Sequence, residues 1–334
     1  MIIQKTLDVP LLVKQLTGET LVEGMTDVWR SKVRALSRAI TFLENDPLLA
    51  MQVLGNADLR DAKTNARVVG LTGLPGAGKS SLTNLIVRSL RAKGKKVAVL
   101  AVDPSSPLSG GALLGDRVRM QEHFKDPNVF IRSMGSRGAL GGVARSTRGA
   151  IRLAGLLGFD TIIVETVGIG QSESEIVELA DTTVLVLMPN SGDEVQLMKA
   201  GVIQLADVYV INKCDLANPE RMINELHENT APDSADAWCP PVLPTSSNNN
   251  TGIEELVDAL ERHSVYELSH PKGVELRKQR AVKEIVRALQ HVFERDFTDA
   301  VSRLSDAQLE EILEGKRSAL ATASELAANL RKRK

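Results

Sequence analysis

The segment GLPGAGKS at residues 73–80 constrains the fold of this chain more than any other feature. It matches the pattern G-x-x-x-x-G-K-[ST] at every fixed position. In this pattern a strand leads into the loop and a helix leaves it, so that backbone N–H groups and the positive helix end converge on phosphate oxygens. The apolar run 68–71 predicts the strand, and the periodic segment 81–92 predicts the helix. We therefore expect an α/β domain with a phosphate-binding loop.

Further apolar runs follow this loop along the chain, each short and rich in Val and Ile. They are mostly continuous rather than alternating, which is typical of strands buried on both faces of a parallel sheet. Segments of helical length separate them. The runs are residues 97–102, 161–164, 183–187 and 208–211. The pattern predicts a doubly wound, mostly parallel α/β sheet over residues 66–263.

Helical periodicity characterises the segments on either side of this domain. In residues 1–65, Leu36, Ile40 and Leu43 recur at helical spacing, and Val286 and Leu289 do so near the other end. The terminal RKRK at 331–334 is predicted to be a solvated tail. We expect an N-terminal helical extension over residues 1–65 and a C-terminal one over residues 264–334.

Composition excludes several classes of protein. The chain has 41 Lys and Arg against 42 Asp and Glu, so a broad basic surface for nucleic acid is not expected. Two cysteines, Cys214 and Cys239, provide neither a disulfide framework nor a four-thiolate metal site. No apolar run reaches the roughly 18 residues of a membrane span. We expect a cytoplasmic protein with no membrane partner and no nucleic-acid partner.

The loop residues have separate roles in phosphate binding. The glycines let the backbone curl around phosphate oxygens, Lys79 is expected to contact the β- and γ-phosphates, and the Ser80 hydroxyl to ligate Mg²⁺. The full predicted phosphate-binding set is Gly73, Gly76, Ala77, Gly78, Lys79, Ser80 and Ser81.

Acidic residues follow two of the predicted strands. Asp103 and Glu165 stand at strand ends, where open α/β sheets bind ligands and where a carboxylate suits Mg²⁺. Gly168 follows Glu165 by three residues and could offer its N–H to the γ-phosphate, which makes this segment a candidate switch. Asp103 could instead cap the turn before Pro104. On spacing alone, Asp116 is as consistent with a solvated loop residue as with a ligand.

The base-recognition signal is NKCD at residues 212–215, directly after a predicted strand. The Asp215 carboxylate can accept both the N1–H and the 2-amino hydrogens of guanine, whereas adenine lacks these donors. Asn212 can bind the base edge, and the stem of Lys213 can cover its face. Thr245, Ser246 and Ser247 could offer backbone N–H groups to guanine O6, or form an ordinary polar loop. The arrangement favours GTP over ATP.

Longer segments resemble the MeaB/MMAA/ArgK GTPases, of the SIMIBI class of phosphate-loop proteins. The resemblance extends over essentially the whole chain. It implies a GTP-hydrolysing chaperone that gates cofactor loading of an adenosylcobalamin-dependent acyl-CoA mutase and protects or reactivates it. It also implies a homodimer whose C-terminal helices form the arm between subunits. The matching segments are VDPSS at 102–106, GG at 110–111, LGD at 114–116, LGGV at 140–143, VETVGIGQSE at 164–173 and GDE at 192–194.

The resemblance also assigns residue roles. It implies that Ser80, Asp103, Asp116 and Glu165 surround Mg²⁺, which raises Asp116 from an even choice to a candidate ligand. It implies a further switch loop at residues 190–201, in which Asp193, Gln196 and Lys199 signal between nucleotide and mutase. The chain departs from the family pattern at two places: Ala200 stands where a second Lys is expected, and the loop at residues 133–138 differs. Both departures bear on which mutase is the partner and not on the GTPase activity.

Bound cobalamin is not expected in this chain. His270-Pro-Lys-Gly273 fits part of the D-x-H-x-x-G cobalamin signature, but Leu268 occupies the acidic position. Related GTPases that insert nickel carry His-rich tracts or paired cysteines, and the sequence has neither. A nickel-type metallochaperone GTPase and a kinase or transport-coupled ATPase are therefore the alternatives, less favoured than a mutase chaperone.

Hydrolysis is expected to proceed by in-line attack of water on the γ-phosphate, with Lys79, Glu165 and Gly168 as the catalytic set. No residue is an evident base, and Gln171 lies three positions beyond Gly168. We therefore expect slow intrinsic turnover that the partner mutase stimulates by ordering the switches. The motifs do not distinguish methylmalonyl-, isobutyryl-, hydroxyisobutyryl- and ethylmalonyl-CoA mutases as that partner.

Overall fold

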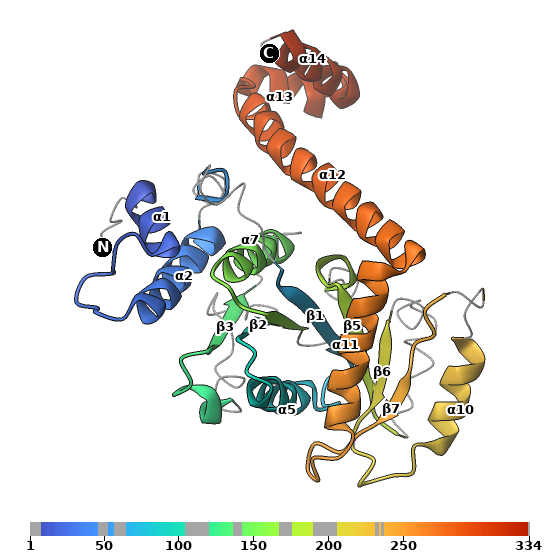
Figure 1. The fold of residues 1–334 in the computed structure, drawn as a ribbon. Helices are drawn as coiled ribbons and strands as arrows, with labels where there is room; N and C mark the ends of the chain where they lie inside the picture. Colours follow the sequence, from blue (N-terminus) through green and yellow to red (C-terminus); the bar gives the residue numbers. More distant parts are fainter. Residues whose placement is uncertain are drawn as a thin grey trace. The chain divides into compact units, whose positions relative to one another are not determined.

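The computed structural model describes residues 8–45, 53–56, 65–103, 120–135, 142–166, 176–189, 206–230, 234 and 237–332. The chain forms two compact units, Met1–His270 and Pro271–Lys334. The first holds a sheet with helices on both faces, and the second consists of helices (Figure 1).

The first unit is built on a seven-stranded sheet in the order β3-β2-β4-β1-β5-β6-β7, and every pair of neighbours is parallel. The strands are β1 (Arg67–Gly73), β2 (Val97–Asp103), β3 (Val129–Gly135), β4 (Thr161–Thr166), β5 (Thr182–Leu187), β6 (Val208–Ile211) and β7 (Val242–Pro244). The chain runs outward from β1 to β3 and then resumes beside β1 through β4 and β5. This topology confirms the predicted doubly wound α/β fold.

Two edge strands were not among the strands predicted from apolar runs. In β3 the sequence VFIRSMG is interrupted by Arg132 and Ser133, and only Phe130 and Met134 are buried. The short strand β7 ends at Pro244, whose missing N–H suits an edge position. Edge strands are covered on fewer sides than central ones, so they lack the continuous apolar runs of β4 to β6.

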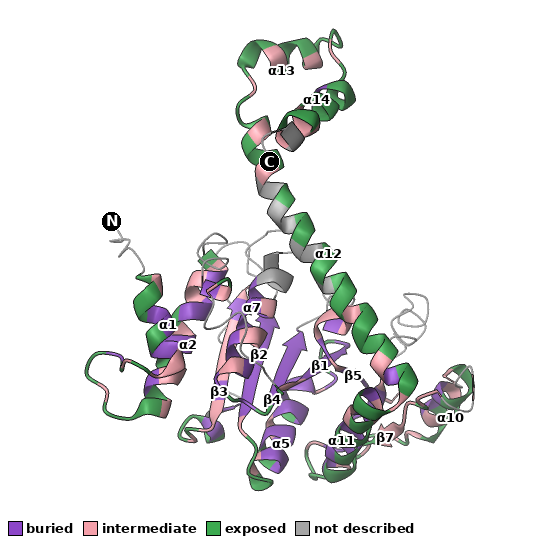
Figure 2. Ribbon diagram, turned by 45° about the horizontal axis from the view of Figure 1, so that its top comes forward, coloured by how far each residue is buried: buried purple, intermediate pink, exposed green. Residues whose placement is uncertain are grey.

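The two faces of the sheet bury separate hydrophobic clusters. Alternation along β2 shows the division, because Val97 and Val99 join one cluster while Ala98 and Leu100 join the other. The first cluster includes apolar side chains of α5 (Lys79–Ala92), α10 (Glu220–Asn229) and α11 (Ile253–Ser269). The second includes those of α1 (Val9–Thr17), α2 (Val28–Asn45) and α7 (Gly142–Leu156). Figure 2 shows the central strands buried between these outer helices, whose far sides are exposed.

The N-terminal helices α1 and α2 are integral to the first unit. Helix α2 packs on α7, where Gly149 lets Leu43 approach closely, since a Cβ at Gly149 would lie 2.8 Å from a Leu43 methyl. Trp29 of α2 packs against Phe159, and its indole N–H donates to the Pro127 carbonyl at 2.6 Å. These contacts attach the predicted helical extension to the sheet.

The second unit holds α12 (Pro271–Val301), α13 (Asp306–Leu313) and α14 (Ala319–Lys332). Helix α13 begins with a capping box, in which Ser305 and Gln308 satisfy each other's backbone N–H groups. Helix α11 runs through the expected boundary at 263/264 and ends at Ser269, one residue before the first unit ends.

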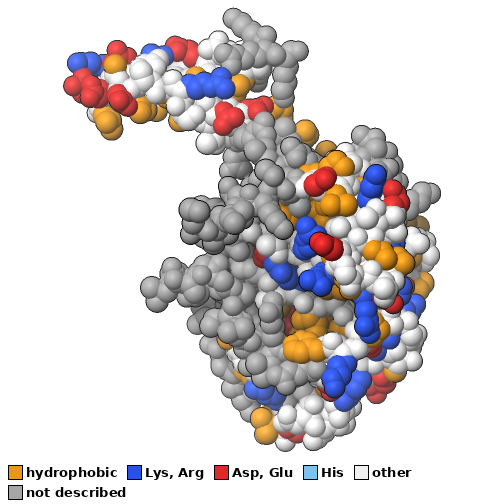
Figure 3. Space-filling model, turned by 90° about the vertical axis from the view of Figure 1, so that its left-hand side faces the viewer, with side chains coloured by type: hydrophobic (Ala, Val, Ile, Leu, Met, Phe, Trp, Pro, Cys, Tyr) orange, Lys and Arg blue, Asp and Glu red, His pale blue; other side chains and the backbone are white. Residues whose placement is uncertain are grey.

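The described surface is mixed in character. On the face shown in Figure 3, Lys and Arg side chains lie scattered among acidic and apolar ones. No helix within the described residues has both the length and the apolar character needed to cross a membrane.

Removal of the Leu36 side chain tests the attachment of α2 to the first unit. Leu36 is fully buried in the second cluster, so Leu36→Ala should lower the free energy of unfolding by about 2–5 kcal/mol, measured by urea denaturation. Leu11→Ala, at a side chain that is 40% exposed on α1, should cost far less. Equal losses in the two variants would contradict a packed role for α2.

Candidate nucleotide site

The candidate site lies at the carboxyl ends of the central strands. The phosphate loop follows β1, Glu165 lies near the end of β4, and the NKCD segment follows β6. In an all-parallel sheet these ends meet at one edge, and β1 is the strand at which the chain's winding changes direction. The fold therefore gathers at this edge the segments that the sequence analysis singled out separately.

Positive backbone φ angles shape the phosphate loop. Gly73, Gly76 and Gly78 have φ of 133°, 79° and 90°, a region that residues other than glycine rarely adopt. Two of these glycines also allow close approach. A Cβ at Gly73 would lie 2.1 Å from the Val186 carbonyl oxygen, and one at Gly78 would lie 2.3 Å from Asn212 Nδ2. The loop therefore requires glycine at both positions.

The Lys79 side chain folds back over the loop. Its Nζ donates to the carbonyl oxygens of Gly73 at 2.7 Å and Leu74 at 3.0 Å, and the side chain is buried. The ammonium group is therefore held at the edge of the loop, where its positive charge adds to that of the α5 N-terminus. Ser81 is exposed in the first turn of α5.

Two hydroxyl groups of α5 bind one carboxylate of β4. Ser80 Oγ donates to Glu165 Oε1 at 2.5 Å, and Thr83 Oγ1 donates to Glu165 Oε2 at 2.9 Å. Glu165 is 1% exposed and Thr83 is fully buried. Each carboxylate oxygen thus has its own hydroxyl donor, and two hard oxygen groups that could hold a metal ion, those of Ser80 and Glu165, stand next to the phosphate loop.

The structure describes the backbone of Asp103, one of the predicted Mg²⁺ ligands. Asp103 ends β2, which is hydrogen-bonded to β4, so its backbone lies at the same edge as Glu165. The remaining predicted switch and Mg²⁺ residues lie outside the described residues: Asp116, Gly168, Asp193, Gln196 and Lys199. Gln171 and Ala200 lie there too.

Asn212 joins the phosphate loop to the base-recognition loop. Its side chain is fully buried, and Nδ2 donates to the carbonyl oxygen of Ala77 at 2.8 Å. Its Oδ1 accepts from Thr245 Oγ1 at 3.2 Å and from the backbone N–H and hydroxyl of Ser247 at 3.2 and 3.1 Å. The side-chain amide of Asn212 therefore holds the two loops together through hydrogen bonds at both its nitrogen and its oxygen.

The Asp215 carboxylate is held by donors from the loop after β7. Ser246 Oγ donates to Oδ1 at 2.6 Å, and Asn248 Nδ2 donates to Oδ2 at 3.0 Å. The hydrogen bond from Ser246, and then that from Asn248, lowers the pKa of the carboxyl group. Asp215 is therefore kept ionised and oriented, which suits it to accept hydrogen bonds from a base.

The backbone of the NKCD segment is held as closely as its side chains. Lys213 adopts φ of 65°, an uncommon conformation for a residue other than glycine. The Cys214 N–H donates to the Thr245 carbonyl at 3.1 Å, and its thiol donates to the Ile211 carbonyl at 3.0 Å. Burial raises the pKa of this thiol.

Thr83 and Asn248 were not predicted as site residues. Thr83 follows Ser80 by three residues, which places both on one face of α5, and this spacing was the available signal. Asn248 lies in the run NNN at residues 248–250, which reads as a polar turn. Neither contact could be assigned without knowing which strand or loop faces each residue.

Comparison with known proteins shows the family of this chain. Residues 36–302 match the family described as "Methylmalonyl Co-A mutase-associated GTPase MeaB". The chain belongs to this family. The match begins in α2 and ends just beyond α12, so it includes the N-terminal attachment as well as the sheet.

Relatives from distant organisms are similar to this chain in sequence. The "Methylmalonic aciduria type A homolog, mitochondrial" of Mus musculus is 43% identical over 246 residues, which are 72% of this chain and 58% of that protein. The "GTPase ArgK" of Escherichia coli is 35% identical over 250 residues, 72% of this chain and 75% of that protein. These relatives and the family description establish this chain as a phosphate-loop GTPase, as the NKCD segment predicted.

The crystal structure of a protein named "LAO/AO transport system kinase" has the same fold. It superposes with a TM-score of 0.64 at 23% sequence identity and covers 97% of each chain. At this identity the likeness concerns the fold alone.

Gly78→Ala tests the contact between the phosphate loop and the base-recognition loop. The added Cβ would displace Asn212, so the dissociation constant for GDP should rise at least about tenfold, measured by titration with a fluorescent GDP analogue. Gly94→Ala is the matched control, because Gly94 also has a positive φ, of 77°, but a Cβ there meets nothing within 4 Å. Similar GDP affinity in the two variants would contradict a role for the Gly78–Asn212 contact in GDP binding.

Proposed function

We propose that this MeaB-family GTPase is a chaperone of an adenosylcobalamin-dependent acyl-CoA mutase. It would gate loading of the mutase's cofactor and protect or reactivate the enzyme. The family description, which names a mutase-associated GTPase and matches residues 36–302, carries the proposal. The name of the mouse relative, which refers to methylmalonic aciduria, supports it. The proposal places the protein in the cytoplasm, with the cobalamin bound by the partner and not by this chain.

The donor set fits a magnesium ion bound with the nucleotide. The Ser80 hydroxyl and the Glu165 carboxylate are hard oxygen donors, and they lie side by side at the entry to α5. Asp103, at the end of β2, and Asp116 complete the proposed ligand set. When bound, Mg²⁺ supplies positive charge next to the phosphates and so favours cleavage of the terminal phosphate.

The residues of the chain provide the remaining parts of GTP hydrolysis. In the proposed mechanism Lys79 exchanges its carbonyl partners for β- and γ-phosphate oxygens, while Gly73, Gly76, Ala77, Gly78 and Ser81 surround the phosphates. Gly168 would donate its N–H to the γ-phosphate. Asp215 and Lys213 would hold the guanine, supported by Thr245, Ser246 and Ser247.

In this proposal, the switch segments signal to the mutase whether GTP or GDP is bound. Glu165 lies at the end of a buried strand, and Gly168 follows it by three residues, so a contact to the γ-phosphate would pull on this segment. Asp193, Gln196 and Lys199 in the loop at 190–201 would carry the signal to the mutase. Slow basal hydrolysis that the partner accelerates follows from this arrangement, because no evident base accompanies the catalytic set.

Binding and stimulation by purified mutases test this proposal. Among methylmalonyl-, isobutyryl-, hydroxyisobutyryl- and ethylmalonyl-CoA mutases, one should bind the chain and raise its rate of GTP hydrolysis, measured by phosphate release. Lys199→Ala should reduce this stimulation. Lys79→Ala, which removes the charge held at the loop, should show neither basal nor stimulated hydrolysis.

Other outcomes of the same assays would contradict the proposal. Faster hydrolysis of ATP than of GTP, with a phosphorylated acceptor, would indicate a kinase or a transport-coupled ATPase. Stoichiometric nickel binding would indicate a metallochaperone. No stimulation by any of these mutases would remove the mutase from the proposal and leave the GTPase.

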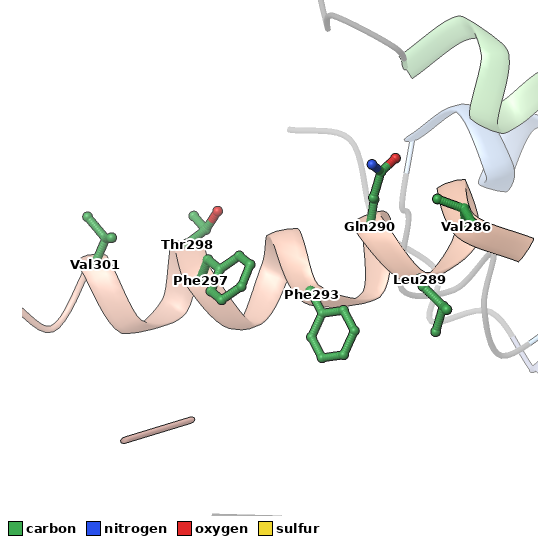
Figure 4. A pocket seen from close by; sticks show the side chains of 7 residues that line it. All are labelled: Val286, Leu289, Gln290, Phe293, Phe297, Thr298 and Val301. Carbon is green, nitrogen blue, oxygen red and sulfur yellow. The ribbon is translucent and has the colours of Figure 1, made fainter. Parts of the chain in front are cut away.

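We also propose that the protein is a homodimer formed through α12. An apolar groove of about 850 Å³ runs along this helix (Figure 4). Its lining residues are Val286, Leu289, Gln290, Phe293, Phe297, Thr298 and Val301. Leu289 and Phe293 are half exposed although they are apolar, which is costly in water. The row contains no charged residue, so the same row of a second copy would fit against it.

Light scattering of the full chain tests the dimer. The wild type should have a mass near twice 36.1 kDa, and Leu289→Asp combined with Phe293→Asp should give the mass of a single chain, since two carboxylates would be buried in the contact. Arg277→Asp is the control, because exposed Arg277 lies on another face of α12 at 100° per residue. A single-chain mass for the wild type would contradict the dimer.

A further inference from the structure

We infer that Thr83 is a positioning residue for the Mg²⁺ site: its hydroxyl fixes the Glu165 carboxylate so that one oxygen stays directed towards Ser80. The inference rests on the role proposed above for Glu165 as a Mg²⁺ ligand. Thr83 itself would touch neither the metal nor the nucleotide.

The geometry distinguishes the two oxygens of Glu165. Thr83 Oγ1 donates to Oε2 at 2.9 Å, and Ser80 Oγ donates to Oε1 at 2.5 Å. Because the two hydroxyls come from positions three apart on α5, they reach the carboxylate from successive turns of one helix face. The carboxylate cannot turn about its last bond without losing one of these bonds, so its orientation is fixed.

Burial makes this contact strong. Thr83 is 0% exposed and Glu165 is 1% exposed, so water has little access to compete for either group. A hydrogen bond to a charged acceptor is stronger than one between neutral groups, and the difference grows away from water. An unbonded carboxylate oxygen at this depth would carry a large desolvation cost.

The usual behaviour of a helical threonine gives a contrast. A Thr hydroxyl within a helix commonly bonds to the carbonyl oxygen one turn earlier, which satisfies it without any neighbour. Thr83 instead donates across to β4, over 82 positions of sequence. The Thr83 hydroxyl therefore holds Glu165 of β4, which lies next to the phosphate loop.

The role resembles that of groups that orient metal ligands in other proteins. Such groups lie one bond behind the ligand, and their removal commonly costs about 10–100-fold in metal affinity while the ligand stays in place. Loss of the Thr83 hydroxyl should therefore weaken Mg²⁺ binding and leave nucleotide binding without the metal intact.

The experiment measures release of a fluorescent GDP analogue from the full chain at increasing free Mg²⁺. Thr83→Val keeps the shape of the side chain and removes its hydroxyl. The Mg²⁺ concentration that gives half-maximal slowing of release should rise about tenfold. Release in EDTA should equal that of the wild type. Thr83→Ser, which keeps the hydroxyl, should return the Mg²⁺ dependence towards the wild-type value.

Controls separate positioning from stability. Thr147→Val removes another fully buried hydroxyl, on α7, whose partner is the Met134 sulfur at 4.0 Å, and it should leave the Mg²⁺ dependence unchanged. Thermal melting checks that each variant is folded, and Thr83→Ala replaces Thr83→Val if the valine variant does not fold.

The outcomes are distinct. If the wild type responds to Mg²⁺ and the hydroxyl-free variant responds identically, the positioning role is wrong while the GTPase and its Mg²⁺ site remain. If Mg²⁺ has no effect on release from the wild type, the proposed role of Glu165 fails, and this inference fails with it.

Discussion

The buried side-chain amide of Asn212 is the contact on which the rest of the site depends. It donates to the phosphate loop at Ala77 and accepts three hydrogen bonds from the loop after β7. This contact joins the loop after β1 to the loops after β6 and β7, which lie further along the sheet, and the proposed GTP would span both. Gly78 is glycine for the same reason, since a side chain there would occupy the place of the Asn212 amide.

Glu165 holds the other side of the site together. A carboxylate that is 1% exposed is costly unless it is hydrogen-bonded, and α5 supplies a hydroxyl for each of its oxygens. The helix that begins at the phosphate loop is thus joined to β4, from which the proposed switch segment departs. Ser80, next to the phosphate loop, therefore contacts Glu165 near the end of β4 directly. This short path is suited to signalling whether the proposed site holds GTP or GDP.

Much of the fold could be predicted from the sequence because central parallel strands leave a clear pattern. Strands β1, β2, β4, β5 and β6 lie over the predicted apolar runs. Strand β3 was not recognised, because Arg132 interrupts its apolar run and forms an ion pair with Glu44 of α2 at 2.6 Å. That pair joins residues 88 positions apart, and local pattern contains no information about it. The attachment of α1 and α2 to the sheet was hidden for the same reason.

The sequence by itself predicted the phosphate loop, the guanine motif and the strands β1, β2, β4, β5 and β6, because these depend on neighbouring residues and fixed spacings. It also predicted Glu165 at a strand end. Only the tertiary structure decided that Thr83 and Ser80 share this carboxylate and that Asn212 joins the two loops. Those contacts join segments distant in the chain, and their partners follow from strand order and helix packing, which become fixed only when the whole sheet is assembled.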